Sequence, residues 1–124
     1  MCNFLNEPVT RIRPEGTAYK LFRKEGASFR PLCKWGYLLA KGESIAWDDS
    51  KVTNDLFGHG GEGFCMVMDK RSAERAAKGG WCYPVVVCKI KYKGGLGKFE
   101  EPLFTKDVST IALCKEFEIV EEIY

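Results

Sequence analysis

A glycine-rich stretch from Gly58 to Gly63 carries the only histidine of the chain, His59, and one carboxylate, Glu62. Glycine occupies four of these six positions, so the backbone could approach a ligand closely, as functional loops often allow. Histidine is also the side chain that titrates nearest to neutral pH. The spacing does not match a phosphate-binding loop, because no strand precedes it and no helix follows. His59 and Gly63 are therefore candidate binding residues, and the alternative is a flexible connector.

A second kind of chemistry is suggested by the residue that follows the initiating methionine. Removal of Met1 would leave Cys2 at the N-terminus, where its own amine could act as the base for a nucleophilic thiol. Hydrolases that use this arrangement have a glycine after the cysteine, whereas this chain has Asn3. An N-terminal-cysteine amide hydrolase is one function that the sequence allows.

The stretch 63–92 predicts a strand, a short helix and a second strand, around which the rest of the chain is organised. The apolar run 64–68 is bounded by a glycine and by Asp69, which favours a strand. Asp69 is a suitable N-cap for an alanine-rich helix over 70–78, and the two glycines that follow provide its stop. The valine-rich run 85–92 is the strongest predicted strand of the chain.

The last predicted strand, 115–123, alternates apolar and acidic residues, as a half-buried strand does. One face is expected to hold Phe117, Ile119 and Ile123, and the other Glu116, Glu118 and Glu122. Glu116 and Glu118, two residues apart, then point to the same side of the sheet.

Further strands are predicted at 19–24 and 108–114, with a hairpin within 36–47. No repeat or composition change marks a second domain, so we expect one α+β domain over 19–124 after an irregular arm over 1–18. The expected fold has mainly antiparallel strands in two packed sheets, with one short Ala-rich helix against them. The residues expected to be largely buried are Leu21, Phe64, Met66, Val86, Cys88, Ile90, Leu113, Phe117 and Ile119.

Charge is distributed unevenly along a chain whose net charge is only +2. Residues 11–34 carry seven basic and two acidic side chains, 7 − 2 = +5, and residues 100–124 carry two basic and seven acidic ones, 2 − 7 = −5. The two ends could neutralise each other on neighbouring strands. Alternatively, the N-terminal part could present a basic face to an acidic partner.

Composition argues against several classes of protein. The small net charge gives little support for nucleic-acid binding, although it does not exclude it. No apolar run is long enough to span a membrane and the N-terminus does not resemble a signal peptide, so we expect a cytoplasmic protein. The six cysteines include no CxxC pair and accompany a single histidine, so we expect no metal site.

The order of elements resembles the small ADP-ribosyltransferase-like fold of bacterial toxins, RNA 2′-phosphotransferases and some phage proteins. Three features carry this resemblance. They are the strand pattern Tyr19-Lys20-Leu21-Phe22-Arg23, the strand–helix–strand stretch 63–92, and the late pair Glu116-Phe117-Glu118. The likeness is one of pattern and covers about residues 19–120.

The resemblance implies NAD as cofactor and ADP-ribosyl transfer as the reaction. In that case Arg23 would bind the pyrophosphate, because a guanidinium forms bidentate charge-assisted hydrogen bonds. Glu118 and Glu116 would be the catalytic pair, one stabilising an oxocarbenium-like state and the other orienting the nucleophile. His59 and Gly63 would lie at the rim of the nucleotide cleft.

A non-catalytic reading of the same scaffold is the alternative. The family usually has polar residues that hold the nicotinamide ribose at the start of its middle strand, whereas this chain has Phe64-Cys65-Met66-Val67. The protein would then bind a host protein or a nucleotide without transforming it, as host-defence inhibitors encoded by phages do. The sequence does not indicate an oligomeric state.

Overall fold

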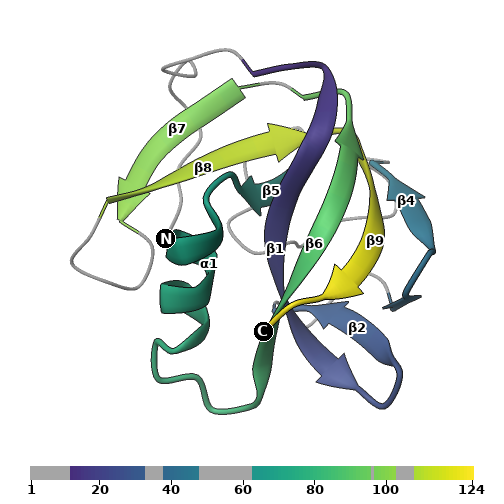
Figure 1. Ribbon diagram of the computed structural model, residues 1–124, viewed down its shortest axis with the longest axis vertical. Helices are drawn as coiled ribbons and strands as arrows, with labels where there is room; N and C mark the ends of the chain where they lie inside the picture. Colours follow the sequence, from purple (N-terminus) through teal and green to yellow (C-terminus); the bar gives the residue numbers. More distant parts are fainter. Residues whose placement is uncertain (1–11, 33–37, 48–62, 96, 103–107) are drawn as a thin grey trace.

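The computed structural model describes residues 12–32, 38–47, 63–95, 97–102 and 108–124, which form a strongly curved sheet and one helix (Figure 1). All strand pairs are antiparallel. The elements in chain order are β1 (Glu15–Glu25), β2 (Ser28–Pro31), β3 (Leu39–Ala40), β4 (Ser44–Ala46), β5 (Phe64–Val67), α1 (Lys70–Ala77), β6 (Val85–Lys93), β7 (Gly97–Pro102), β8 (Val108–Cys114) and β9 (Glu116–Glu122). The expected small α+β domain of mainly antiparallel strands with one short helix is confirmed.

The strands belong to one sheet in the order β4-β9-β6-β1-β5-β8-β7, with β2 paired to β1 and β3 to β2. The expectation of two packed sheets is therefore wrong. The cause lies in β1, an eleven-residue strand that pairs with β6 over residues 15–23 along one edge. Along its other edge β1 pairs first with β5 and then with β2, so it joins strands that would otherwise form separate sheets. The strand begins at Glu15, inside the arm expected over 1–18.

The curvature of the sheet follows from the core that it surrounds. Strands β1, β6 and β9 form one wall, and β5, β8 and β7 cross toward the other side of the molecule (Figure 1). Side chains from both groups meet in one set of buried residues, which we call the inner cluster. It consists of Ala18, Phe22, Phe29, Leu39, Phe64, Met66, Cys88, Ile90, Tyr92, Ala112, Cys114, Phe117 and Ile119. Within it, the ring of Phe64 stands edge-on to that of Phe117, with centroids 4.9 Å apart.

The opposite face of the same strands is covered in part by α1. Ala73 and Ala76 are fully buried on the side of the helix that contacts the sheet. Their small side chains let the helix backbone lie close to the strands. They belong to the outer cluster, which consists of Leu21, Leu32, Cys65, Val67, Ala73, Ala76, Val87 and Leu113. As predicted, Asp69 caps the helix, accepting hydrogen bonds from the backbone N–H of Ser72 at 3.0 Å and from its hydroxyl at 2.9 Å.

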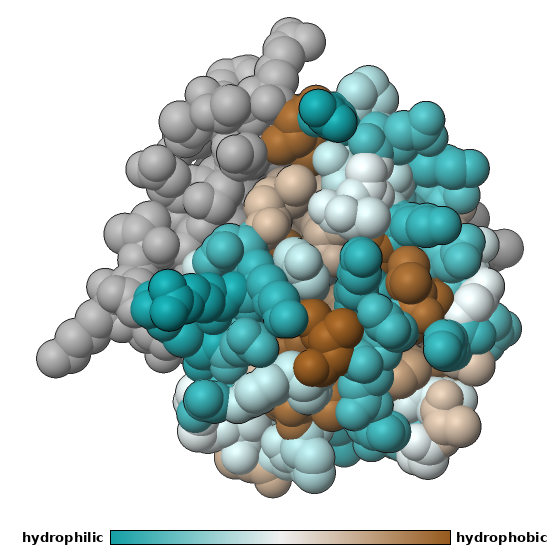
Figure 2. All heavy atoms as spheres, in the orientation of Figure 1, coloured by the Kyte–Doolittle hydropathy of each residue, from teal (hydrophilic) through white to brown (hydrophobic). Residues whose placement is uncertain are grey.

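The predicted core is almost entirely confirmed. All nine residues expected to be buried are so except Val86, which is half-buried and packs against the inner cluster. Consecutive residues of β1 and β5 are buried although they point to opposite faces of the sheet. One face packs in the inner cluster, and the other packs in the outer cluster with α1. On the surface shown in Figure 2, apolar residues form small separate patches among hydrophilic ones.

In the described part of the range 36–47, where a hairpin is expected, the two short strands β3 and β4 are not paired with each other. β3 pairs with β2, and β4 pairs with β9, so the two short strands join the sheet at different places. The chain turns between them at Gly42, which has a φ of +88° and donates its N–H to the carbonyl of Ile119 at 2.8 Å.

The expected faces of the last strand are correct as far as Ile119 and wrong beyond it. Ile90 of β6 lies opposite Ile119, but the preceding Lys89 lies opposite Glu121, so a β-bulge occurs at this point. The extra residue reverses the alternation, and Ile123 packs with the outer cluster. Glu122 correspondingly forms an ion pair of 2.7 Å with Lys24.

Within the described ranges α1 is the only helix, and no helix there is long and apolar enough to cross a membrane.

Candidate functional site

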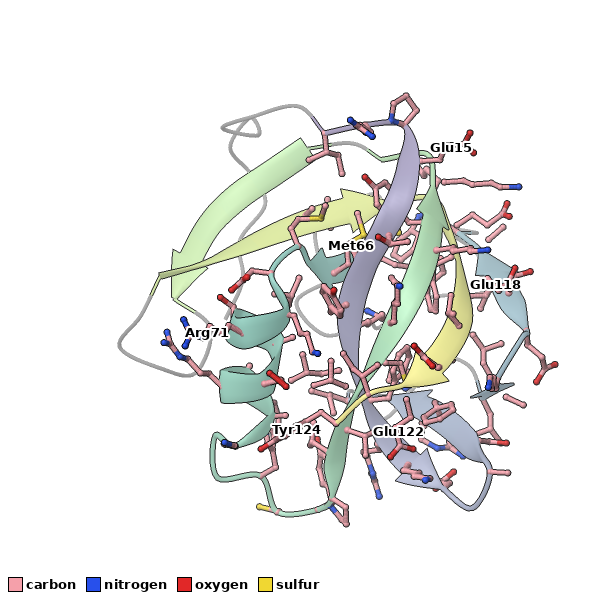
Figure 3. All side chains as sticks on the ribbon, viewed as in Figure 1. Glu15, Met66, Arg71, Glu118, Glu122 and Tyr124 are labelled. Carbon is pink, nitrogen blue, oxygen red and sulfur yellow. The ribbon has the colours of Figure 1, made fainter. Side chains whose placement is uncertain are left out.

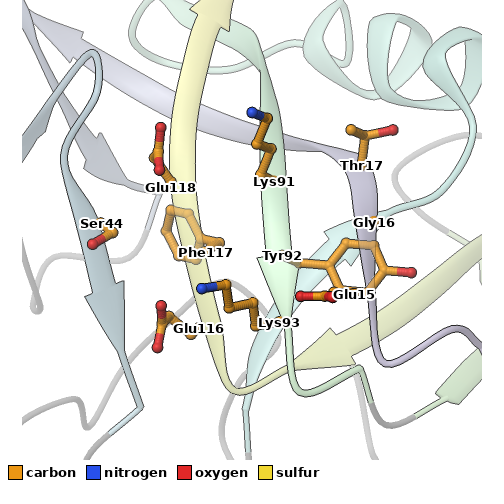
Figure 4. A pocket seen from close by; sticks show the side chains of 10 residues that line it. All are labelled: Glu15, Gly16, Thr17, Ser44, Lys91, Tyr92, Lys93, Glu116, Phe117 and Glu118. Carbon is orange, nitrogen blue, oxygen red and sulfur yellow. The ribbon is translucent and has the colours of Figure 1, made fainter.

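A shallow trough of about 480 Å³ lies over one end of strands β1, β6, β9 and β4 (Figure 4). It contains both glutamates that the sequence singled out as a pair. Tyr92 and Phe117 also line it, although these residues are only 3 % and 1 % exposed and belong to the inner cluster. The residues that line it are Glu15, Gly16, Thr17, Ser44, Lys91, Tyr92, Lys93, Glu116, Phe117 and Glu118.

The strand register arranges the polar side chains of the trough in two rows across four strands. The first row runs from Thr17 through Lys91 and Glu118 to Ser44. The second row runs from Glu15 through Lys93 and Glu116 to Ala46. Residues directly opposite on antiparallel strands have Cβ atoms about 5 Å apart, so each glutamate lies next to a lysine of β6.

These rows contain Glu116 and Glu118, two of the seven acidic residues in the C-terminal segment 100–124. Lys89 also lies opposite Glu121, so β6 faces the acidic residues of β9 with a lysine at three positions. The expected neutralisation between the two ends of the chain is seen in the ion pair of Lys24 with Glu122. The lysines opposite Glu116, Glu118 and Glu121 come from β6, outside the N-terminal segment. Such pairs at a surface contribute little stability, of the order of 0–1 kcal/mol each.

The trough is open to solvent along its walls. Glu116 and Glu118 are half-buried, whereas Lys91, Lys93 and Glu15 are exposed. Figure 3 shows Glu118 on the side of β9 that faces β4, and Glu15 near the start of β1. Two lysines and three glutamates give the trough a formal charge of 2 − 3 = −1.

The structure does not bring Arg23 to the two glutamates. Glu118 lies opposite Lys91, Lys91 lies opposite Thr17, and Arg23 is 23 − 17 = 6 residues further along β1. At about 3.3 Å per residue this separation is roughly 20 Å. The guanidinium of Arg23 instead lies 4.4 Å from the ring centroid of Tyr83, a cation–π contact beside the outer cluster.

Gly63 is held in a tight contact at the start of β5. A Cβ atom built on Gly63 would lie 2.5 Å from the backbone oxygen of Cys114 on the neighbouring β8. The absence of a side chain is therefore required by strand packing here. His59 and Cys2, the other two candidates, lie outside the described residues.

Three of the four cysteines in the described residues belong to the core. Cys65, Cys88 and Cys114 are buried, and Cys82 is exposed. Burial away from water, followed by the nearby charge of Glu122, raises the pKa of the Cys88 thiol from its usual 9.0 to about 12. Cys88 therefore stays protonated and is a poor nucleophile at neutral pH. In the described part of the chain, no three His, Cys, Asp or Glu side chains gather to hold a metal ion.

The lysines of the trough were not identified from the sequence, although a signal for them exists. Lys89, Lys91 and Lys93 alternate with Ile90 and Tyr92, so their charges share one face of a strand. The glutamates of β9 repeat with the same period of two residues. Opposite charge with equal period indicates two neighbouring strands.

No protein-family model, no curated protein and no solved structure matches this chain.

Proposed function

We propose that the protein is a binding module that engages a partner protein through the trough without transforming it chemically. The observation that carries this proposal is the form of the trough, which is shallow, walled by exposed charged side chains, and separated from Arg23 by roughly 20 Å along β1. Sites for small molecules are usually concave and bury most of the ligand, which an open trough does not do. A charged open surface is better suited to the face of another macromolecule, where charges guide association and specificity.

The proposal agrees with the apolar start of β5. Phe64 and Met66 are part of the inner cluster, and Cys65 and Val67 belong to the outer cluster. The four residues therefore serve packing, and none of their side chains is exposed to hold a ribose. By the resemblance to small phage proteins, the partner would be a host protein, and the module would act as a host-defence inhibitor in the cytoplasm.

NAD-dependent ADP-ribosyl transfer on an ADP-ribosyltransferase-like scaffold is the second candidate. One observation favours it, namely that Glu116 and Glu118 share the trough with Lys91 and Lys93. Lysine is a common ligand of phosphate groups, so these two could bind a pyrophosphate in place of Arg23. The reaction would then need NAD to bind in the trough with its ribose against the glutamates.

The two candidates are separated by one pair of measurements. A photo-reactive amino acid at Ser44, an exposed trough residue, should cross-link a discrete partner in a lysate of the producing cells. The matched control is the same amino acid at Glu121, which is exposed on β9 outside the trough and should give no such adduct. Calorimetric titration with NAD should show no binding.

Turnover of NAD that is lost in Glu118→Gln would overturn the binding-module proposal and establish the transferase. Equal cross-linking from both positions would show that the trough is not the binding surface.

A further inference from the structure

We propose that the trough binds an extended segment of the partner that carries two basic side chains at alternate residues, one for Glu118 and one for Glu116. This inference rests on the proposed function, because it names the ligand of the same surface. It commits to arginine or lysine side chains of a protein as the binding groups.

The first argument is that lysines lie next to the two glutamates on one side only. On the β6 side, Glu118 faces Lys91 and Glu116 faces Lys93. On the β4 side, the residues opposite them are Ser44 and Ala46, which carry no charge. Each carboxylate has two oxygens and can accept several hydrogen bonds, so a cation can approach it from the β4 side while the lysine stays on the β6 side.

The second argument is the size of the residues on β4. Ser44 and Ala46 are small and exposed. They belong to β4, which is the last strand on this side of β9 in the described strand order. Figure 4 shows the short side chain of Ser44 on the β4 side of Glu118. A long basic side chain can therefore lie across Ser44 or Ala46, with its aliphatic part on β4 and its charged group at the glutamate.

The third argument is spacing. Glu116 and Glu118 are two residues apart on one strand, which places them roughly 6.6 Å apart on the same face. An extended peptide has the same repeat, so side chains at alternate positions match both carboxylates at once. Adjacent basic residues point to opposite sides of an extended chain and can supply only one contact.

Charge argues against an acidic segment as the ligand. Lys91 and Lys93 are exposed, but each is flanked in its row by a carboxylate or a hydroxyl, and the trough as a whole carries three glutamates against two lysines. A carboxylate from a partner would meet Glu15, Glu116 or Glu118 within the same rows. The net charge of −1 therefore favours a cationic ligand.

The test uses the full chain, labelled with ¹⁵N, and three end-blocked pentapeptides that are titrated while amide shifts are recorded. One peptide carries two arginines at alternate positions among serines, one has the same composition with its two arginines adjacent, and one carries two glutamates at alternate positions among serines. We expect the alternating arginine peptide to shift amides of β4, β6 and β9 and to bind at least about threefold more tightly than its isomer. The affinity should fall with added salt, because exposed charges are screened.

Three variants locate the contacts. Glu118→Gln and Glu116→Gln should each weaken binding of the alternating arginine peptide about tenfold, in the range of a lost hydrogen bond to a charged group. Ser44→Lys should weaken it as strongly, because the new ammonium takes the position of the ligand next to Glu118. Glu121→Gln, at an exposed position outside the trough, should bind like the parent apart from the general loss of one charge. All four positions are exposed or half-buried, so thermal melts should confirm that the variants fold.

Each result decides the inference. Equal binding of the two arginine isomers, tighter binding of the glutamate peptide, or unchanged binding in the trough variants overturns it. If no peptide binds while the cross-link from Ser44 persists, the ligand assignment fails and the binding module stands. If the cross-link is also absent, both proposals fail.

Discussion

Lys20 donates a hydrogen bond from its Nζ to the backbone carbonyl of Cys65 at 2.6 Å, across the pairing of β1 with β5, and is itself only 3 % exposed. The ammonium also lies about 5.9 Å from the ring centroid of Phe22 and 5.8 Å from that of Phe117. A lysine inside a core is rare, because a buried charge must be compensated by such contacts. We expect this residue to act in stability rather than in binding.

Replacement of Lys20 should therefore depend strongly on the shape of the new side chain. Lys20→Ala leaves a cavity and should lower the free energy of unfolding by about 2–5 kcal/mol. Lys20→Met keeps most of the volume and removes the buried charge, so it should lose roughly half as much or less. Urea denaturation of both variants measures the difference, and equal losses would show that the charge, not the packing, is what matters.

Gly63→Ala tests whether this glycine is required by packing. The added Cβ would meet the backbone oxygen of Cys114 at 2.5 Å, and β8 cannot move away without breaking its pairing with β5. We expect a loss of about 1–3 kcal/mol in the free energy of unfolding. Ligand binding should stay as in the parent after correction for the unfolded fraction. A variant that melts normally but loses binding would return Gly63 to the binding site.

Asp69 should stabilise the helix in a pH-dependent way. Its pKa is lowered from the usual 3.8, chiefly by the hydroxyl of Ser72 and then by the backbone N–H of the same residue. The ionised form is favoured in the folded state, so the stabilisation is complete above pH 3.8 and is lost as the pH falls through the lower folded pKa.

Asp69→Ala should therefore cost about 1 kcal/mol at pH 7. The difference from the parent should shrink in acid. Ser72→Ala removes only the hydroxyl contact, so its free energy of unfolding should lie between those of the parent and Asp69→Ala. Urea denaturation at a series of pH values measures all three. A difference that is constant with pH would contradict the capping role.

Cys88 should make the protein less stable in alkali. Its folded pKa of about 12 exceeds the usual 9.0, so its contribution is complete below pH 9.0 and is lost as the pH rises toward 12. Tyr92, whose pKa is also raised by burial, adds in the same direction. The unfolding free energy should decline above pH 9.0, and less steeply in Cys88→Ala.

Alkylation at neutral pH provides an independent measurement of the same burial. Iodoacetamide should modify Cys82 in the folded protein and spare Cys65, Cys88 and Cys114, as peptide mass spectrometry can determine residue by residue. In urea all four should react. Rapid labelling of Cys88 in the native protein would show that the inner cluster opens.

Arg23 should contribute to stability through Tyr83. The cation–π contact at 4.4 Å is half-buried at both residues, and the hydroxyl of Tyr83 donates to the carbonyl of Leu32 at 3.0 Å. Arg23→Gln should cost about 0.5–2 kcal/mol. A double-mutant cycle with Tyr83→Leu should show coupling, whereas peptide binding in the trough should be unchanged. Absence of coupling, with loss of NAD binding, would support the role in pyrophosphate binding.

Several local features were determined by the sequence alone. The strand 64–67, the Asp69 cap, the helix that follows and the valine-rich strand all form where the local pattern predicts them. The alternation Phe117, Glu118, Ile119 was sufficient to place the glutamates outside and the apolar residues in the core. These features depend on residues within one or two turns of each other, and short-range preferences therefore decide them.

Tertiary structure decided which strands meet. Lys91 lies opposite Glu118 only because β6 and β9, separated by two other strands in the sequence, are neighbours in the sheet. The bulge between Lys89 and Ile90 moved Ile123 to the opposite face, since one additional residue reverses a period of two. The separation of Arg23 from Glu118 has the same origin. Distances along a strand follow from its sequence, but the register that sets one strand against another depends on how the whole core packs.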